Sequence, residues 1–140
     1  MLFSVIGHYS LILGLFIGLI LIFFSIKNFR NSINLDTKIL SFTFLQFILV
    51  VVSFLCLILS FVFSDFSNET VFNNSHTTKP LFYKISGTWG NHEGSLLLWL
   101  LVLTLFIFLF LIKTKDQPTK YKILTLVFQQ VIIIGFFVFL

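Results

Sequence analysis

Four long runs of hydrophobic residues, separated by polar segments, dominate the chain. They extend over roughly residues 9–24, 39–63, 95–112 and 123–140. Each run reaches or approaches the ~20 apolar residues that an α-helix needs to cross about 30 Å of hydrocarbon. The pattern predicts an all-α polytopic membrane protein with four transmembrane helices. It forms one membrane domain over residues 1–140, with a polar outer loop, residues 64–94, between the second and third helices.

The composition supports a membrane protein, since 58% of the 140 residues are hydrophobic and only 10% are charged. No basic residue comes before the first hydrophobic run, and no small-residue cleavage site precedes Lys27. We therefore expect this run to be retained and not removed as a signal peptide. The single cysteine, Cys56, lies inside the second run. Because there is no second cysteine, an intrachain disulfide is excluded, and the position inside the run predicts a small buried side chain.

Basic residues are unevenly distributed among the polar segments. Lys79 and Lys84 lie in the outer loop, and the other seven of the nine lie in the first and third connections: Lys27, Arg30, Lys38, Lys113, Lys115, Lys120 and Lys122. Because positively charged loops stay on the side of synthesis, both termini and residues 64–94 are predicted to lie on the opposite side. The four lysines of the third connection suit an anionic membrane surface. The net charge of +4 therefore indicates topology and contact with membrane lipid, and not nucleic acid.

Small and polar residues recur at helical spacing inside the hydrophobic runs. Ser10, Gly14 and Gly18 are spaced by four in the first run, a pattern that lets another helix approach closely and predicts a helix-packing face. Gln46, Ser53 and Ser60 follow one another at intervals of seven in the second run. Polar side chains in hydrocarbon tend to face protein, so we expect this face of the second helix to form a contact surface. The fourth run also contains two glutamines, Gln129 and Gln130.

The outer loop changes character near its middle. Residues 64–78 are rich in Asn, Ser and Thr, and we interpret them as solvated coil. After Pro80 the residues Leu81, Phe82 and Tyr83 are apolar or aromatic, which suits a segment lying along the membrane surface. Trp89 and Trp99 can be explained as interfacial anchors, without any further function.

His92 and Glu93 stand where the outer loop runs into the third hydrophobic run. A residue between 88 and 91 can cap a helix that begins here, which places Glu93 in the first turn, where the helix dipole favours a carboxylate. His92, Leu96 and Trp99 then share a face. Such a histidine can be a haem or metal ligand, a proton carrier or a hydrogen-bonded structural residue.

No metal site is predicted. Leu96 stands where a zinc-protease HExxH motif needs its second histidine. We interpret His8, alone before the first run, as an interfacial residue. The sequence also holds no phosphate-binding Gly-rich loop, no Ser/His/Asp set and no Cys/His cluster.

The string WGNHEGSLLLW, Trp89 to Trp99, resembles the early signature of the CcmF family of the cytochrome c maturation system. The segments IGHY, from Ile6 to Tyr9, and Asp65–Phe66 also resemble family segments, so the likeness covers almost the whole chain. The related protein used for haem attachment in nitrite reductase maturation shares the string, which does not separate the two. The motif residues taken as a candidate functional site are Trp89, Gly90, His92, Glu93, Gly94, Ser95 and Trp99.

The resemblance implies a membrane subunit of the complex that attaches haem to apocytochrome c, with CcmE-like and CcmH-like proteins as partners. In that family the tryptophan-rich WWD segment and the haem-ligating histidines lie further along. Haem is therefore implied for the whole assembly, and no cofactor or catalytic residue is assignable to this chain. The chain resembles the N-terminal fragment of a split haem lyase whose remaining fragments carry the WWD segment.

The cellular location follows from the same likeness and from composition. The chain has 21 phenylalanines, and its abundant Phe, Ile, Leu, Asn and Lys suggest an AT-rich genome. We expect the mitochondrial inner membrane, with a bacterial plasma membrane as the alternative. The termini and residues 64–94 then face the intermembrane space or periplasm.

A second function remains open on composition and topology alone. A non-catalytic structural subunit of a respiratory complex would have the same four hydrophobic runs and basic loops. The motif from Trp89 to Trp99 is what favours haem attachment. A larger partner protein with a WWD segment, encoded in the same genome, would discriminate between the two.

Overall fold

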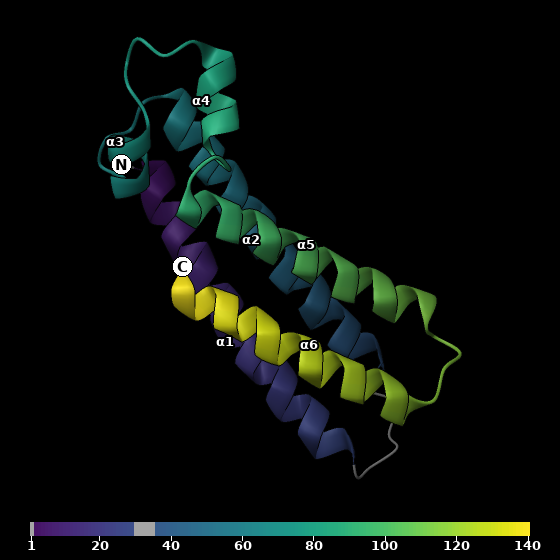
Figure 1. Ribbon diagram of the computed structural model, residues 1–140. Coiled ribbons are helices and arrows are strands. Elements are labelled where there is room, and N and C mark those ends of the chain that lie inside the picture. The colour runs from purple at the N-terminus through teal and green to yellow at the C-terminus, as the bar shows by residue number, and fades with distance from the viewer. Residues whose placement is uncertain (1, 30–35) are drawn as a thin grey trace.

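A computed structural model describes residues 2–29 and 36–140, and within these ranges all regular structure is helical. Four long helices form a bundle (Figure 1). Two short helices gather at one end of it. The six elements are α1 (Leu2–Phe29), α2 (Asp36–Val62), α3 (Glu69–Asn74), α4 (Leu81–Gly87), α5 (His92–Lys113) and α6 (Thr119–Phe139). The predicted all-α class with four membrane-spanning helices is confirmed.

All four long helices are long and apolar enough to cross a membrane. Each begins before its predicted hydrophobic run, and α1 and α5 also end after theirs, whereas α2 and α6 end one residue earlier than predicted. α1 has 28 residues, so at 1.5 Å per residue it is about 42 Å long, which exceeds the ~30 Å of hydrocarbon. Residues such as Ser4 and Lys27 continue the helix because backbone hydrogen bonding does not stop where the side chains become polar. Arg30, predicted in the first connection, lies outside the described residues.

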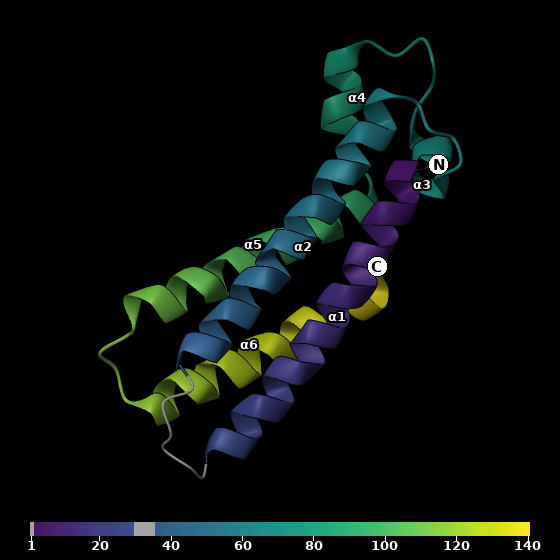
Figure 2. The same cartoon turned by 180° about the vertical axis from the view of Figure 1, so that it is seen from behind.

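The long helices follow one another around the bundle. α1 packs against α2 and α6, and α5 packs against the same two helices. α5 and α6 lie in front in Figure 1, and α1 and α2 lie in front in Figure 2. The chain begins and ends toward the end that carries α3 and α4, since Phe3 and Leu140 line one cavity there. This end is called the outer end below.

The small-residue stripe of α1 makes its close contacts inside this chain. Ser10, Gly14 and Gly18 are buried. A Cβ atom at Gly14 would lie 2.8 Å from the ring of Phe137 on α6. At Gly18 it would lie 2.9 Å from the side-chain nitrogen of Gln46. The glycines thus let α1 approach α2 and α6, as small residues do in membrane helix packing.

Two buried glutamines connect opposite helices in the middle of the bundle. Gln130 Nε2 on α6 donates a hydrogen bond of 2.8 Å to Gln46 Oε1 on α2. Gln46 Nε2 in turn contacts Gln130 Oε1 at 3.3 Å and the Gly14 carbonyl oxygen at 3.2 Å. Both side chains are fully buried. Because hydrocarbon offers no alternative partners, this amide pair fixes the relative positions of α1, α2 and α6.

Residues 64–78, interpreted above as solvated coil, contain α3, so that interpretation is wrong. Asn68 caps α3 by accepting a hydrogen bond of 3.0 Å from the Thr70 amide, and its own amide group reaches Ser4 Oγ on α1 at 3.5 Å. Val71 is fully buried. A six-residue helix is unstable alone. The local cap stabilises it here together with two contacts to the rest of the bundle, the burial of Val71 and the contact of Asn68 with Ser4.

Hydrogen bonds also hold the outer loop, residues 64–94, against the end of α2. Ser64 has φ 53°, in the left-handed region that glycine usually occupies at the end of a helix. The Asp65 amide then donates a hydrogen bond to the Ser60 carbonyl oxygen, which terminates α2. Lys84 of α4 donates a hydrogen bond of 2.6 Å to Ser64 Oγ. α4 itself keeps Leu81, Phe82 and Tyr83 exposed, consistent with the predicted surface segment.

Candidate functional site

The motif from Trp89 to Trp99 forms the join between α4 and α5. Asn91 is the N-cap of α5, and its side-chain oxygen accepts a hydrogen bond of 2.7 Å from the Gly94 amide. The Asn91 amide group donates to the carbonyl oxygens of Gly87 at 2.9 Å and Thr88 at 3.2 Å. One side chain therefore holds the end of α4 against the beginning of α5. The cap predicted between residues 88 and 91 is Asn91.

Gly94 is the sterically restricted position of the motif. A Cβ atom added to Gly94 would overlap the Thr88 carbonyl oxygen and lie 2.8 Å from the Thr88 carbonyl carbon. Both atoms belong to the backbone, and Thr88 is itself fully buried. The turn before α5 folds back onto the first helical turn so closely that only glycine fits.

The remaining motif side chains do not gather in one place. His92 and Glu93 are exposed in the first turn of α5, and Ser95 Oγ donates to the His92 carbonyl at 2.8 Å. Trp99 is 60% exposed and Trp89 is 42% exposed. Gly90 is also exposed and has only ordinary contacts. The predicted face of His92 and Trp99 therefore lies on the outside of the bundle.

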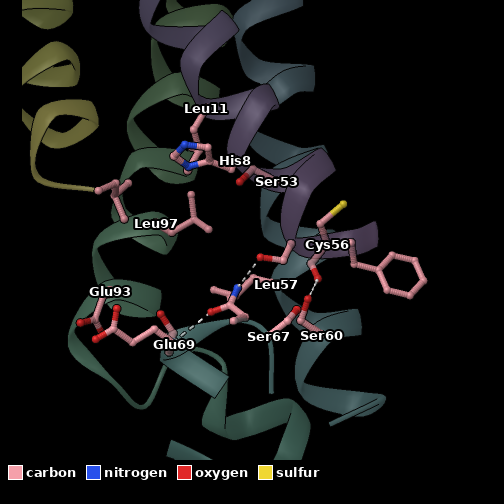
Figure 3. A pocket seen from close by; sticks show the side chains of 16 residues that line it. His8, Leu11, Ser53, Cys56, Leu57, Ser60, Ser67, Glu69, Glu93 and Leu97 are labelled. Atoms are coloured by element: carbon pink, nitrogen blue, oxygen red, sulfur yellow. Dashed lines mark hydrogen bonds between the residues drawn. The ribbon is translucent and has the colours of Figure 1, made fainter. Parts of the chain in front are cut away.

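A cavity of about 240 Å³ lies beside the motif at the outer end (Figure 3). Its walls come from α1, α2, α3 and α5, with the chain end after α6. The polar residues that line it are Ser4, His8, Ser53, Ser60, Ser67, Asn68, Glu69, Thr70 and Glu93. Figure 3 shows the side chains of His8, Glu69 and Glu93 at this cavity, each from a different helix.

The cavity brings together His8 and Glu93, which the sequence did not predict to share a site. Glu93 lines it, and His92 does not. The histidine that lines it is His8 of α1, which we interpreted above as an interfacial residue. His8 belongs to the IGHY segment of the family resemblance, so that likeness was the one signal in the sequence that connected it with Glu93.

The cavity has the chemistry of a small polar site. It holds one imidazole and two carboxylates, groups that can exchange protons or hold a cationic or hydrogen-bonding group. Water occupies about 30 Å³ per molecule in the liquid, so several water molecules fit. In the described part of the chain, no three His, Cys, Asp or Glu side chains are placed to hold a metal ion.

The cavity volume of about 240 Å³ is below the ~300–1,000 Å³ of typical ligand pockets. The cavity offers a single histidine, His8. We assign no haem to it.

The chain is similar to bacterial cytochrome c biogenesis proteins. It is 44% identical over 101 residues to the cytochrome c-type biogenesis protein CycK of Rhizobium meliloti, covering 69% of this chain and 14% of the relative. It is 32% identical over 134 residues to the cytochrome c-type biogenesis protein CcmF of Haemophilus influenzae, covering 95% of this chain and 21% of the relative. This chain thus spans only about a fifth or less of the length of these relatives. No protein-family profile matches it.

A solved structure shares the same arrangement of helices. The structure titled cytochrome c heme lyase CcmF superposes with a TM-score of 0.87 and 25% sequence identity. The superposition covers 96% of this chain and 23% of that one. Sequence and fold therefore agree over almost the full extent of the chain.

Proposed function

The chain is a homologue of the CcmF-type cytochrome c-type biogenesis proteins, and from this relationship we propose that it is a membrane subunit of the complex that attaches haem to apocytochrome c. The carrying observation is that relatedness in sequence and in fold extends over at least 95% of this chain. Because the chain spans a small part of the relatives, the rest of the haem lyase is supplied elsewhere, in the same polypeptide or in a partner.

We propose that the outer end is where this subunit meets the haem-handling machinery. Three features support the proposal. The motif is held in one conformation by Asn91 and Gly94, its aromatic and ionisable side chains are left exposed, and a polar cavity with His8 and Glu93 opens beside it. A rigid backbone that presents exposed polar and aromatic groups is typical of a contact site.

The proposed partners are the remaining haem lyase with its WWD segment, CcmE-like and CcmH-like proteins, and apocytochrome c. We propose haem as the cofactor of the whole assembly and assign no haem ligand to this chain. We propose the mitochondrial inner membrane on the basis of composition, or a bacterial plasma membrane, as in the organisms of the relatives reported above.

Substituting His92→Ala and Glu93→Gln together is expected to lower covalent haem attachment several-fold and to leave the complex assembled. Both side chains are exposed, so neither is needed for packing. Attachment is measured by haem staining of c-type cytochromes after denaturing electrophoresis, and assembly by co-purification. His8→Ala is expected to act in the same direction, because His8 lines the cavity with Glu93.

His76→Ala is the matched control, since His76 is an exposed histidine of the outer connection that does not line the cavity. It is expected to leave both measurements unchanged. Normal haem attachment in the His92→Ala/Glu93→Gln variant would refute a functional role for the pair. Loss of the assembled complex would instead show that the pair is structural.

The proposed topology predicts the result of cysteine labelling in intact membranes. With Cys56 replaced by Ser, a cysteine at exposed Thr77 is expected to react with a membrane-impermeant maleimide from the intermembrane-space or periplasmic side. A cysteine at exposed Gln117, between α5 and α6, is expected to react from the opposite side only. Reaction of both positions from one side would overturn the topology.

A further inference from the structure

The outward side of α6 differs from those of the other three long helices. On α1, α2 and α5 the large side chains that point away from the bundle are hydrophobic, as contact with lipid requires; examples are Phe16, Leu55 and Phe106. Other polar side chains within the spans, such as Thr43, Ser53 and Thr104, are buried. On α6, Gln129 is only partly buried. An amide thus reaches the surface of an otherwise apolar bundle.

Gln129 lies at the depth of the hydrocarbon. It is the middle residue of the 21 residues of α6, so about 15 Å of helix extends on either side of it. The adjacent Gln130 is hydrogen-bonded to Gln46 in the middle of the bundle. Lipid tails at this depth offer neither donors nor acceptors to an amide.

The Gln129 amide also has no partner in the part of the chain that the structure describes, because no hydrogen bond joins it to another described residue. Hydroxyl side chains on outward faces bond to their own helix instead. Thr125 Oγ1 donates to the Tyr121 carbonyl oxygen at 3.1 Å, and Ser41 Oγ donates to the Thr37 carbonyl oxygen at 2.9 Å. The two donors and the acceptor oxygen of the Gln129 amide therefore remain available to another chain segment.

Gln129 belongs to a line of side chains along α6, which we call the α6 seam: Thr125, Gln129, Ile132 and Phe136. These residues follow one another at intervals of four, three and four, so they lie along one side of the helix. None of them is buried, and Ile132 is 50% exposed. Alternating intervals of three and four are those with which one helix packs along another. The α6 seam thus offers a second helix an apolar surface with one amide in it.

We propose that a transmembrane helix of the remaining haem lyase packs along the α6 seam and forms a hydrogen bond with the Gln129 amide. The proposal rests on the proposed function, which supplies the identity of the partner. This chain spans 21% of the Haemophilus influenzae relative and 23% of the solved haem lyase, so most of such a protein lies outside these helices. The partner segment is helical because backbone at this depth must satisfy its own hydrogen bonds. Polar side chains in hydrocarbon face protein, so the amide favours a helix over lipid as the occupant.

Site-specific photocrosslinking in intact membranes tests the proposal. The chain with Gln129→benzoylphenylalanine is co-expressed with the remaining lyase, and the adducts are identified by mass spectrometry. Gln129 is expected to yield an adduct with a hydrophobic peptide of the remaining lyase. Phe16→benzoylphenylalanine is the matched control on the outward side of α1, where Phe16 is 56% exposed. It is expected to yield lipid adducts and no such peptide.

Gln129→Leu provides a second measurement. It removes the amide without removing any hydrogen bond between described residues, so the bundle is expected to fold. The amount of remaining lyase that co-purifies with the tagged chain is expected to fall about threefold or more, the effect of one interhelical hydrogen bond in a membrane. Phe128→Leu, at the adjacent exposed position, is the matched control and is expected to leave this amount unchanged. Equal recovery of the lyase with both variants would overturn the proposal.

The crosslinking outcomes separate this proposal from the proposed function. Lipid adducts alone at Gln129, with the lyase still co-purifying, would overturn the packing on the α6 seam and leave the proposed function intact. An adduct with a second copy of this chain would overturn the packing in the same way, as would equal peptide adducts at Gln129 and Phe16. Absence of any co-purifying lyase, with Gln129 crosslinked to a membrane protein of another complex, would overturn the proposed function together with the partner named here.

Discussion

Gly94→Ala is expected to prevent recovery of the folded protein, whereas Gly90→Ala is expected to be recovered at near wild-type levels. The two glycines stand in the same motif, and neither has a positive φ angle. At Gly94 the added methyl group meets the backbone of Thr88, which cannot move without displacing the turn before α5. At Gly90 the nearest heavy atom would be 3.5 Å away, an ordinary contact.

Helix propensity and steric overlap predict opposite signs for Gly94→Ala. Alanine is a better helix former than glycine by ~1 kcal/mol, so propensity alone predicts stabilisation within α5. Overpacking typically costs ~1–3 kcal/mol, and overlap with fixed backbone belongs at or above the top of that range. The steric term therefore decides the result.

The measurement is the yield of the monodisperse complex after size-exclusion chromatography, with its thermal midpoint where it is recovered. Wild-type yield and midpoint for Gly94→Ala would show that the turn before α5 is not packed as described. An equal loss for Gly90→Ala would show that the motif tolerates no side chain at either glycine.

Gly18→Leu is expected to have the second-largest effect, because Gly18 lies against the buried amide pair. A Cβ atom there would be 2.9 Å from Gln46 Nε2 and 3.3 Å from Gln130 Oε1. Leucine would separate the two amides. The variant then loses interhelical hydrogen bonds, worth about 0.6–1.7 kcal/mol in membrane proteins, and adds an overpacking cost of ~1–3 kcal/mol.

Gly135→Leu is the matched control, since nothing lies within 4 Å of an added Cβ there. Phe16→Leu, at an exposed position of α1, is a second control. The thermal midpoint and yield of Gly14→Leu are expected to lie between those of Gly18→Leu and those of the two controls. The nearest neighbour of an added Cβ at Gly14 is the Phe137 ring, a side chain that can move. Equal thermal midpoints and yields for the Gly18, Gly135 and Phe16 variants would contradict the close approach of α1 to α2 and α6.

The number and approximate position of the membrane helices could be predicted from the sequence. Each helix satisfies its own backbone hydrogen bonds, so a run of apolar residues is sufficient to identify it. The helix ends were predicted less well. Ser4, Lys27 and His92 are polar and still helical, because a helix can continue past the hydrocarbon into the headgroup layer.

The structure of the outer loop, residues 64–94, was the part that the sequence predicted least well. α3 has only six residues, and its sequence of Asn, Thr and Glu carries no strong helical periodicity. It is stabilised by contacts that no local pattern contains, the burial of Val71 and the contact of Asn68 with Ser4 of α1. The Asn91 cap, in contrast, was predicted to within four residues because capping is a local interaction.

The candidate motif was visible as a string, but its internal roles were not. The string named His92 and Glu93 as a pair, and the structure brings Glu93 to a cavity with His8 instead. The constraint on Gly94 arises because the Thr88 carbonyl folds back over it. Neighbours in sequence point in different directions on a helix, so adjacency along the chain does not determine which side chains share a site.

The sequence by itself therefore determined the helical class, the four membrane spans, the charge asymmetry of the loops and the family likeness, because these depend on local composition. The tertiary structure alone decided which polar residues meet. Gln46 and Gln130, 84 residues apart, share two hydrogen bonds. His8 and Glu93 line one cavity. These juxtapositions follow from the order in which the helices pack, which is set by the shapes of contacting faces and not by any one segment.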